Sequence, residues 1–362
     1  MIRVVRSITV VLAAVVVSLP ALPIAASADT IRDRQWHLAS LEVVRAQQFS
    51  VGEGVLVAVA DTGVDDRQGE LAGAVIEGKE FGEGASGNGK ADTDGHGTAM
   101  AGLIAGRGLP NGAGVLGIAP KATILPVQTI HSEFGGTPEN LAAGITWSVS
   151  HGAQVICVAA VTSEYPEVRY AVEAAIQAGV VVVAGVGNAP KSKQVGFPAK
   201  LPGVLAVAGT DKAGNHAAIS ATGPEVVLSA PAVDIVSLDA FGKYSTGDGT
   251  SNSTAIVAGV VALVRAKFPQ LSAAEVIRRL TATATDRGKP GRDDEYGYGI
   301  VNPVAALTAE LPAAASSTTA TTTTPPGKRH GGGVAGVGVG WVVVGVGVVG
   351  GVAVWWVRRR TR

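Results

Sequence analysis

The chain has 362 residues, which is enough for one large domain, because α/β enzymes often exceed 200 residues as a single unit. Its 29 basic residues balance its 29 acidic residues, so the composition gives no indication of a nucleic-acid partner. The mean hydropathy of +0.32 is high for a soluble protein, and apolar segments at the two ends explain much of the excess.

The first 28 residues have the pattern of a secretory signal peptide. Two arginines precede a largely apolar run from residue 8 to about residue 22, and Ala26-Ser27-Ala28 provides a small-residue cleavage site. We therefore expect residues 1–28 to be removed on export. An uncleaved anchor helix is the alternative, and the shortness of the apolar run favours cleavage.

Residues 29–311 alternate apolar strands with helical segments, which predicts a three-layer α/β domain with a parallel sheet covered on both faces. Short runs rich in β-branched residues are expected to be buried strands: 55–60, 123–128, 154–160, 180–184 and 204–208. Helices are expected at 94–106, 139–151, 167–179, 254–268 and 271–283. Ser272 and Glu275 form the pattern of a capping box at the last helix. The single cysteine, Cys157, falls in the third run, so we expect a buried thiol and no intramolecular disulfide.

The C-terminal part has the composition of a stalk followed by a membrane anchor. Residues 312–330 are rich in Ala, Ser, Thr and Pro, which predicts a linker. Residues 334–357 carry no charge and as a helix would be ~36 Å long, enough to cross a ~30 Å hydrocarbon core. We expect a transmembrane helix within 331–357 and a basic cytoplasmic tail at 358–362. A low-complexity Gly/Val tail is the alternative, because such a sequence forms helices poorly in water.

Three short segments each place one chemically active side chain among small residues. Asp61 ends a predicted strand before Thr-Gly, His96 lies in Asp-Gly-His-Gly-Thr, and Ser251 lies in Gly-Thr-Ser ahead of a long apolar helix. A serine hydroxyl becomes nucleophilic when a histidine takes its proton, and an aspartate orients the imidazole. Each residue alone fits a structural role as a turn aspartate, a capping histidine or an N-cap serine. Together, in the order Asp, His, Ser, they predict a serine-protease triad.

These segments resemble the subtilisin-like serine proteases, or subtilases, whose triad runs in this order. The resemblance implies a subtilisin-like fold, peptide-bond hydrolysis through an acyl-enzyme, and no cofactor. It also implies that Asn188, after the apolar strand at 180–184, donates its side-chain amide to the oxyanion. An asparagine after a glycine is otherwise most often a turn residue. We can assign no metal ligands in this chain.

Within this family the chain is similar to the mycosins, which are membrane-anchored proteases of actinobacterial type VII secretion. The similar segments are Gln35–Leu38 and residues 198–210 and 297–307, and the layout from signal peptide to basic tail also matches. The resemblance implies a polypeptide substrate, secretion-machinery membrane proteins as partners, and a location in the cell membrane. The protease domain would be extracytoplasmic and the C-terminus cytoplasmic.

Two departures from the family pattern affect the expected substrate-binding groove. The family usually has Ser-Leu-Gly where this chain has Ala159-Ala160-Val161, a segment that forms one edge of the groove and the entrance to the primary pocket. Val161 adds bulk where a glycine is usual. Gly135 and Gly136 are expected at the opposite edge. After Ser251 the chain has Asn252-Ser253-Thr254-Ala255 instead of an aromatic or Met, Ala, a small residue and Pro.

Two functional hypotheses follow. The first is an active serine endopeptidase with a narrow primary pocket. The second is a catalytically degenerate subtilase that acts as a binding or assembly module of a secretion complex. The retained Asp61, His96, Ser251 and Asn188 favour the first hypothesis.

Overall fold

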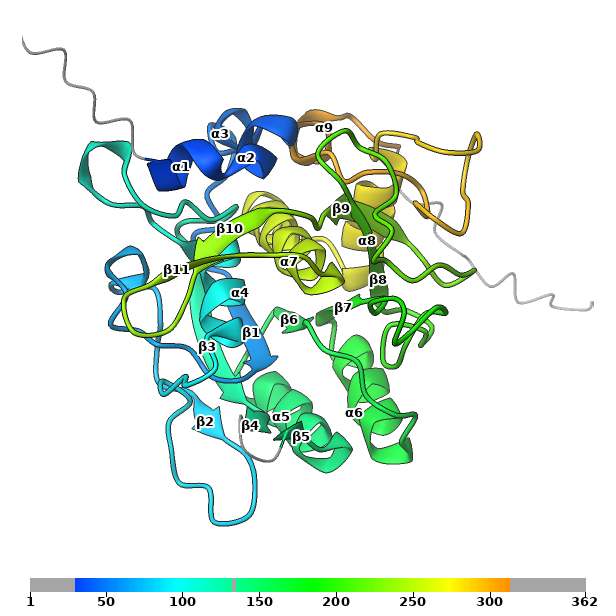
Figure 1. Ribbon diagram of the computed structural model, residues 1–362. Helices are drawn as coiled ribbons and strands as arrows, with labels where there is room; N and C mark the ends of the chain where they lie inside the picture. The colour runs from blue at the N-terminus through cyan, green and yellow to red at the C-terminus, as the bar shows by residue number, and fades with distance from the viewer. Residues whose placement is uncertain (1–29, 132–134, 313–362) are drawn as a thin grey trace, which may run out of the picture. The chain divides into compact units, whose positions relative to one another are not determined.

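The computed structural model describes residues 30–131 and 135–312 (Figure 1). The predicted signal peptide, the linker beyond residue 312, the predicted membrane helix and the basic tail lie outside the described residues. Within the described residues, no helix has both the length and the apolar character needed to span a membrane. The contacts divide the chain into two units, residues 1–314 and 315–362, and the description below concerns the first.

A seven-stranded parallel sheet forms the centre of the domain, with the strand order β2-β3-β1-β6-β7-β8-β9 (Figure 1). Its strands are β1 Leu56–Asp61, β2 Lys79–Glu80, β3 Thr123–Gln128, β6 Val155–Val158, β7 Val181–Gly185, β8 Leu205–Thr210 and β9 Leu228–Pro231. Five of them match the predicted strands. The prediction missed β2, which has only two residues, and β9, whose Leu-Ser-Ala-Pro sequence lacks a β-branched run.

Helices cover both faces of this sheet, which confirms the three-layer prediction. They are α4 His96–Ala105, α5 Pro138–Ser150, α6 Pro166–Gln177, α7 Thr250–Lys267, α8 Ala273–Ala282 and α9 Pro303–Thr308. Because strand side chains alternate, Val57 and Val59 of β1 join the core beneath α4 and α7. Ala58 and Ala60 face the second core, beneath α5 and α6. Cys157 is fully buried, as expected.

Two helix starts test the sequence prediction in detail. Ser272 and Glu275 form the predicted capping box at α8, each side chain bonding to the other residue's backbone amide. The predicted start of α7 at residue 254 was wrong, because the helix begins at Thr250 and its N-cap is Gly249. The sequence preceding residue 254 is polar and contains glycines, so hydrophobic periodicity did not extend into the first turn.

The N-terminal segment forms three short helices, α1 Thr30–Arg34, α2 Trp36–Ser40 and α3 Val43–Ala46. Gln35 is buried and exchanges two hydrogen bonds with the backbone of Leu116, at 3.0 and 2.8 Å. The Trp36 indole donates to the carbonyl oxygens of Val233 and Asp234, both at 3.2 Å. The Gln-Trp-His-Leu segment therefore ties the start of the domain to the chain leading into β10.

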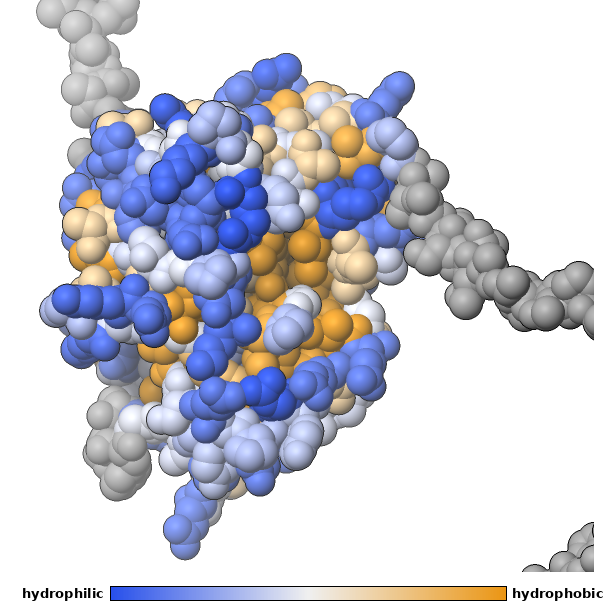
Figure 2. Space-filling view, turned by 90° about the vertical axis from the view of Figure 1, so that its right-hand side faces the viewer, coloured by the Kyte–Doolittle hydropathy of each residue, from blue (hydrophilic) through white to orange (hydrophobic). Residues whose placement is uncertain are grey.

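The remaining short elements lie around the sheet. β10 Ile235–Leu238 and β11 Tyr244–Gly247 form an antiparallel hairpin, and β4 Ile130–His131 pairs antiparallel with β5 Gly135–Gly136. Two 3₁₀ turns occur at η1 Gly69–Leu71 and η2 Pro110–Gly112. On the face shown in Figure 2, apolar residues gather near the centre and hydrophilic residues surround them. The domain therefore carries apolar residues on its surface as well as in its two cores.

Candidate active site

The four predicted catalytic positions lie at the carboxyl ends of the strands or at adjoining helix starts. Asp61 is the last residue of β1, and Asn188 follows β7 by three residues. His96 is the first residue of α4 and Ser251 the second residue of α7. This edge of an open parallel sheet is where ligands bind in α/β proteins. His96 and Ser251 line one cavity of about 250 Å³.

Asp61 and His96 are directly paired. Asp61 Oδ1 lies 2.7 Å from His96 Nδ1 and also accepts a hydrogen bond from the Thr62 amide at 2.8 Å. Asp61 is fully buried, whereas 35% of the His96 side-chain surface is exposed. The negative charge of Asp61 raises the pKa of His96 above its usual value, while burial acts in the opposite direction. The pair is therefore arranged to hold the imidazole in one orientation with its other edge open to the cavity.

The glycines on either side of His96 are required by close packing. Gly95 has φ of 97°, and a Cβ atom there would lie 1.9 Å from Asp239 Oδ1. A Cβ atom at Gly97 would lie 2.1 Å from the carbonyl oxygen of Gly63. The Gly-His-Gly sequence thus lets the start of α4 press against both the β10–β11 turn and the chain that leaves β1.

Ser251 and Asn188 come together beside Gly249. A Cβ atom at Gly249 would lie 3.0 Å from Ser251 Oγ and 3.4 Å from Asn188 Nδ2, so the glycine leaves space between the two side chains. Asn188 Oδ1 accepts hydrogen bonds from the amide and hydroxyl of Thr250, both at 3.0 Å. These bonds fix the carboxamide and leave its NH₂ group on the Ser251 side. Within the described residues Ser251 makes no hydrogen bond to His96, and such contacts often tighten only when substrate binds.

The two predicted edges of the groove also meet. Ala160 and Val161 follow β6, and together with Gly136 of β5 they line a second cavity of about 90 Å³. Gly135 is exposed beside it, and Ala159 is buried. This second cavity also includes Thr129 and Leu141. Ser251 and His96 belong to the other cavity.

Val161 lies close to two glycines. A Cβ atom at Gly196 would lie 2.5 Å from Val161 Cγ1, and one at Gly187 would lie 3.4 Å from the same atom. The valine side chain therefore packs against two glycine backbones, one of which precedes Asn188. It is also 47% exposed, so it faces solvent along the groove.

Sequence reasoning missed the residues that support these positions. Thr250 orients Asn188, Thr62 Oγ1 accepts a hydrogen bond from the Gly97 amide at 2.9 Å, and Asp92 accepts bonds around the start of α4. A serine-protease motif marks the reacting side chains but not their partners. For Asp92, its place four residues before His96 in a glycine-rich turn was the available signal.

Comparisons with known proteins show which family the fold belongs to. The model of the subtilase family matches residues 52–299. Subtilisin DY of Bacillus licheniformis is 36% identical over 273 residues, covering 74% of this chain and 96% of that protein. Mycosin-3 of Mycobacterium tuberculosis is 34% identical over 337 residues, covering 75% and 71%.

The chain is also similar to solved structures of MycP proteases. The crystal structure of MycP1 from Mycobacterium smegmatis has a TM-score of 0.70 and 31% identity, covering 79% of this chain and 87% of that chain. The structure of the MycP3 protease from the type VII (ESX-3) secretion system has a TM-score of 0.67 and 31% identity, covering 76% and 88%. The similarity therefore extends over most of the described domain.

Proposed function

The chain belongs to the subtilase family and is a subtilisin-like serine peptidase related to the mycosins, and from this premise we propose that it is an active endopeptidase. Asp61, His96 and Ser251 are its triad and Asn188 is its oxyanion donor. The observation that carries this assignment is the buried Asp61 carboxylate 2.7 Å from His96 Nδ1, with His96 and Ser251 lining one cavity.

The proposed reaction follows from these positions. The His96 Nδ1–H group donates a hydrogen bond to Asp61, which stays ionised, so that Nε2 can take the hydroxyl proton of Ser251. Ser251 Oγ attacks the peptide carbonyl, and Asn188 Nδ2 donates to the oxygen that becomes negative. His96 then returns the proton to the leaving amine, and water hydrolyses the acyl-enzyme by the same route.

We propose that the substrate is a polypeptide with a small side chain on the acyl side of the cleaved bond. The packing of Val161 against Gly187 and Gly196 supports this preference, because it fills space beside the oxyanion donor. The exposed backbone of Gly135 and Gly136 on the opposite edge suits an extended peptide. The obstructed cleft of the degenerate alternative has less support, because Val161 lies outside the cavity that contains Ser251.

The cellular setting is proposed from the mycosin relationship and from the two ends of the sequence. A signal peptide at 1–28 would direct export of the domain and then be cleaved, and a helix within 331–357 would anchor it beside type VII secretion proteins. Alkaline extraction of membranes tests the anchor. The full chain should remain in the membrane pellet, and a chain ending at residue 330 should be released.

Active-site labelling with a fluorophosphonate tests the catalytic assignment. The full-length protein should be labelled, and Ser251→Ala should abolish labelling and lower kcat by about 10⁶-fold, a magnitude taken from subtilisin. Ser150→Ala is the matched control, because Ser150 is exposed on α5 and bonds to the carbonyl of Trp147. Absence of labelling in a folded wild-type protein would support the degenerate alternative, and labelling of Ser251→Ala would refute the nucleophile assignment.

A further inference from the structure

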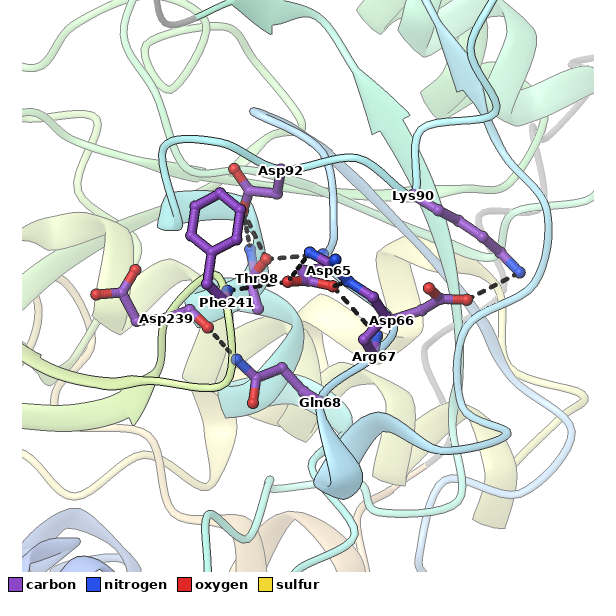
Figure 3. A network of polar contacts seen from close by, with 9 residues as sticks. All are labelled: Asp65, Asp66, Arg67, Gln68, Lys90, Asp92, Thr98, Asp239 and Phe241. Carbon is purple, nitrogen blue, oxygen red and sulfur yellow. Dashed lines mark hydrogen bonds and ion pairs between the residues drawn. The ribbon is translucent and has the colours of Figure 1, made fainter.

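The carboxylate of Asp92 accepts hydrogen bonds from residues around the start of α4, and Figure 3 shows the two from Thr98. Its carboxylate is buried, and Oδ1 accepts from the amides of Asp94 and Gly95 at 3.1 and 2.9 Å. Oδ2 accepts from the amide and hydroxyl of Thr98 at 3.0 and 2.6 Å. The bonded residues lie on both sides of His96, so one carboxylate holds the backbone before and after the histidine.

These bonds satisfy groups that the helix itself cannot. The first amides of a helix lack intrahelical partners, and negative charge near this end is favourable. The N-cap residue Gly95 has no side chain that could accept these bonds, so the carboxylate of Asp92 caps the helix instead. The Gly97 amide is bonded separately to Thr62 Oγ1. The backbone around His96 is thereby fixed by partners from two different segments.

The same network extends to the β10–β11 turn (Figure 3). Thr98 Oγ1 accepts from the Asp65 amide at 2.9 Å, and the buried Asp65 carboxylate accepts from the Phe241 amide at 2.9 Å. Gln68 Nε2 donates to the carbonyl oxygen of Asp239. Thr98 thus joins the start of α4 to the chain after β1, and Asp65 and Gln68 join that chain to the hairpin turn.

We infer that Asp92 is a positioning residue that fixes the imidazole of His96 for proton transfer, acting through the backbone of α4 and the hydroxyl of Thr98. In the described part of the chain, Asp92 makes hydrogen bonds to Asp94, Gly95 and Thr98 and none to Asp61, His96, Ser251 or Asn188. Its role rests on the proposed function, because a position for His96 matters only if His96 is the base. An asparagine at this site would retain one acceptor oxygen but turn an NH₂ group toward the two donors of Thr98.

The charge of Asp92 adds an effect that can be measured separately. The charged groups that face His96 from the surrounding elements are carboxylates: Asp61, Asp92, Asp94, Asp239 and Asp248. The charge of Asp61 is the main cause of the raised pKa of His96, and Asp94 and Asp92 act in the same direction. Removing the charge of Asp92 lowers the pKa of His96, so the acid limb of kcat/KM should move to lower pH.

The test compares full-length variants by kcat, KM and the pH profile of kcat/KM. Asp92→Asn should lower kcat by about 10- to 100-fold with KM within about threefold, because misplacement of a catalytic group affects the reacting complex most. Thr98→Val should lower kcat in the same direction, and Thr98→Ser, which keeps the hydroxyl, should retain kcat near the wild-type value. Asp293→Asn is the control, because Asp293 also accepts three backbone amides but lies outside this network.

The outcomes separate this inference from the proposed function. Failure of the wild-type protein to react with a fluorophosphonate would overturn the proposed function itself. A reactive wild type with unchanged kcat and acid limb in folded Asp92→Asn would overturn the positioning role alone, even if the melting temperature fell. If Asp92→Asn does not fold, the two Thr98 variants decide. Equal kcat values in Thr98→Val and Thr98→Ser would overturn the positioning role, and a lower kcat in Thr98→Val alone would support it.

Discussion

The two sides of the proposed cleft are built from different interactions. Around His96, buried carboxylates and hydroxyls bond to backbone amides, and the glycines on either side of the histidine have no room for a side chain. At the opposite side, Val161 is half exposed and packs against glycine backbones, and Gly135 and Gly136 are exposed. On the first side, side-chain oxygens bond to backbone amides, whereas on the second side Val161 makes van der Waals contacts and the hydrogen bonds join backbone to backbone.

This difference corresponds to what each side is proposed to do. Proton transfer requires atoms to be held at hydrogen-bonding distance, so the residues around His96 have several partners each. A groove that receives an extended peptide must leave backbone groups unpaired until the peptide arrives. Substitution should therefore abolish catalysis on the first side and alter substrate preference on the second. Asn188 lies between them, because Thr250 holds its oxygen and its NH₂ group faces Ser251.

After loss of the nucleophile itself, the largest effect on kcat is expected at this boundary. Asn188→Ala should lower kcat by about 10²–10³-fold with a small change in KM, because the amide strengthens its bond only as the oxyanion forms; this magnitude was measured in subtilisin. Asn188→Asp is the informative companion, because it keeps an acceptor for Thr250 but has no NH₂ donor. Steady-state kinetics on both variants checks this. Activity retained in Asn188→Asp would mean that the residue only holds Thr250 in place.

A change of specificity is expected on the second side. Val161→Gly should raise kcat/KM for substrates with Leu or Phe on the acyl side by about 10- to 100-fold relative to Ala substrates, because it opens space beside Gly187 and Gly196. The relative kcat/KM of Val161→Ala should lie between those of the wild type and Val161→Gly. Peptide-library profiling measures this, and a wild-type enzyme that already cleaves well after Phe or Leu would contradict the narrow pocket.

The sequence predicted more about the first side than about the second. The strands at 55–60, 123–128, 180–184 and 204–208 were found because parallel strands buried on both faces are continuous apolar runs. Asp61 and His96, which the motif singled out, lie 2.7 Å apart, and their catalytic role stays a proposal. The β10–β11 hairpin was not predicted, since β11 is exposed and its Tyr-Ser-Thr-Gly sequence gives no strong alternation.

The residues that support the site could not be predicted from the sequence, for a different reason. Asp92 accepts from backbone amides, and Thr250 donates its own amide to the Asn188 side chain; such bonds depend on loop conformation rather than on a side-chain pattern. The start of α7 depends likewise on Gly249 and on the oxygen of Asn188, which lies 62 residues away in the chain. Motif spacing identifies the reacting groups, and only the folded chain reveals what orients them.

The smallest effect, a purely electrostatic one, is expected at Asp94 on the first side. Asp94 is exposed, its Oδ1 accepts from the His96 amide at 3.3 Å, and its charge adds to that of Asp61 in raising the pKa of His96. Asp94→Asn keeps an acceptor oxygen and removes the charge. Imidazolium is then less favoured, so the pKa of His96 falls and the acid limb of kcat/KM moves to lower pH.

Salt separates this charge effect from a change of geometry. An exposed charge is screened at 1 M ionic strength, where the Debye length is ~3 Å, so the difference between wild type and Asp94→Asn should shrink there. The plateau value of kcat should stay within about twofold, because the variant keeps its bond to the His96 backbone. A lowered plateau at both salt concentrations would show that Asp94 also positions the helix start, which would extend the directional network from the buried carboxylates to the surface.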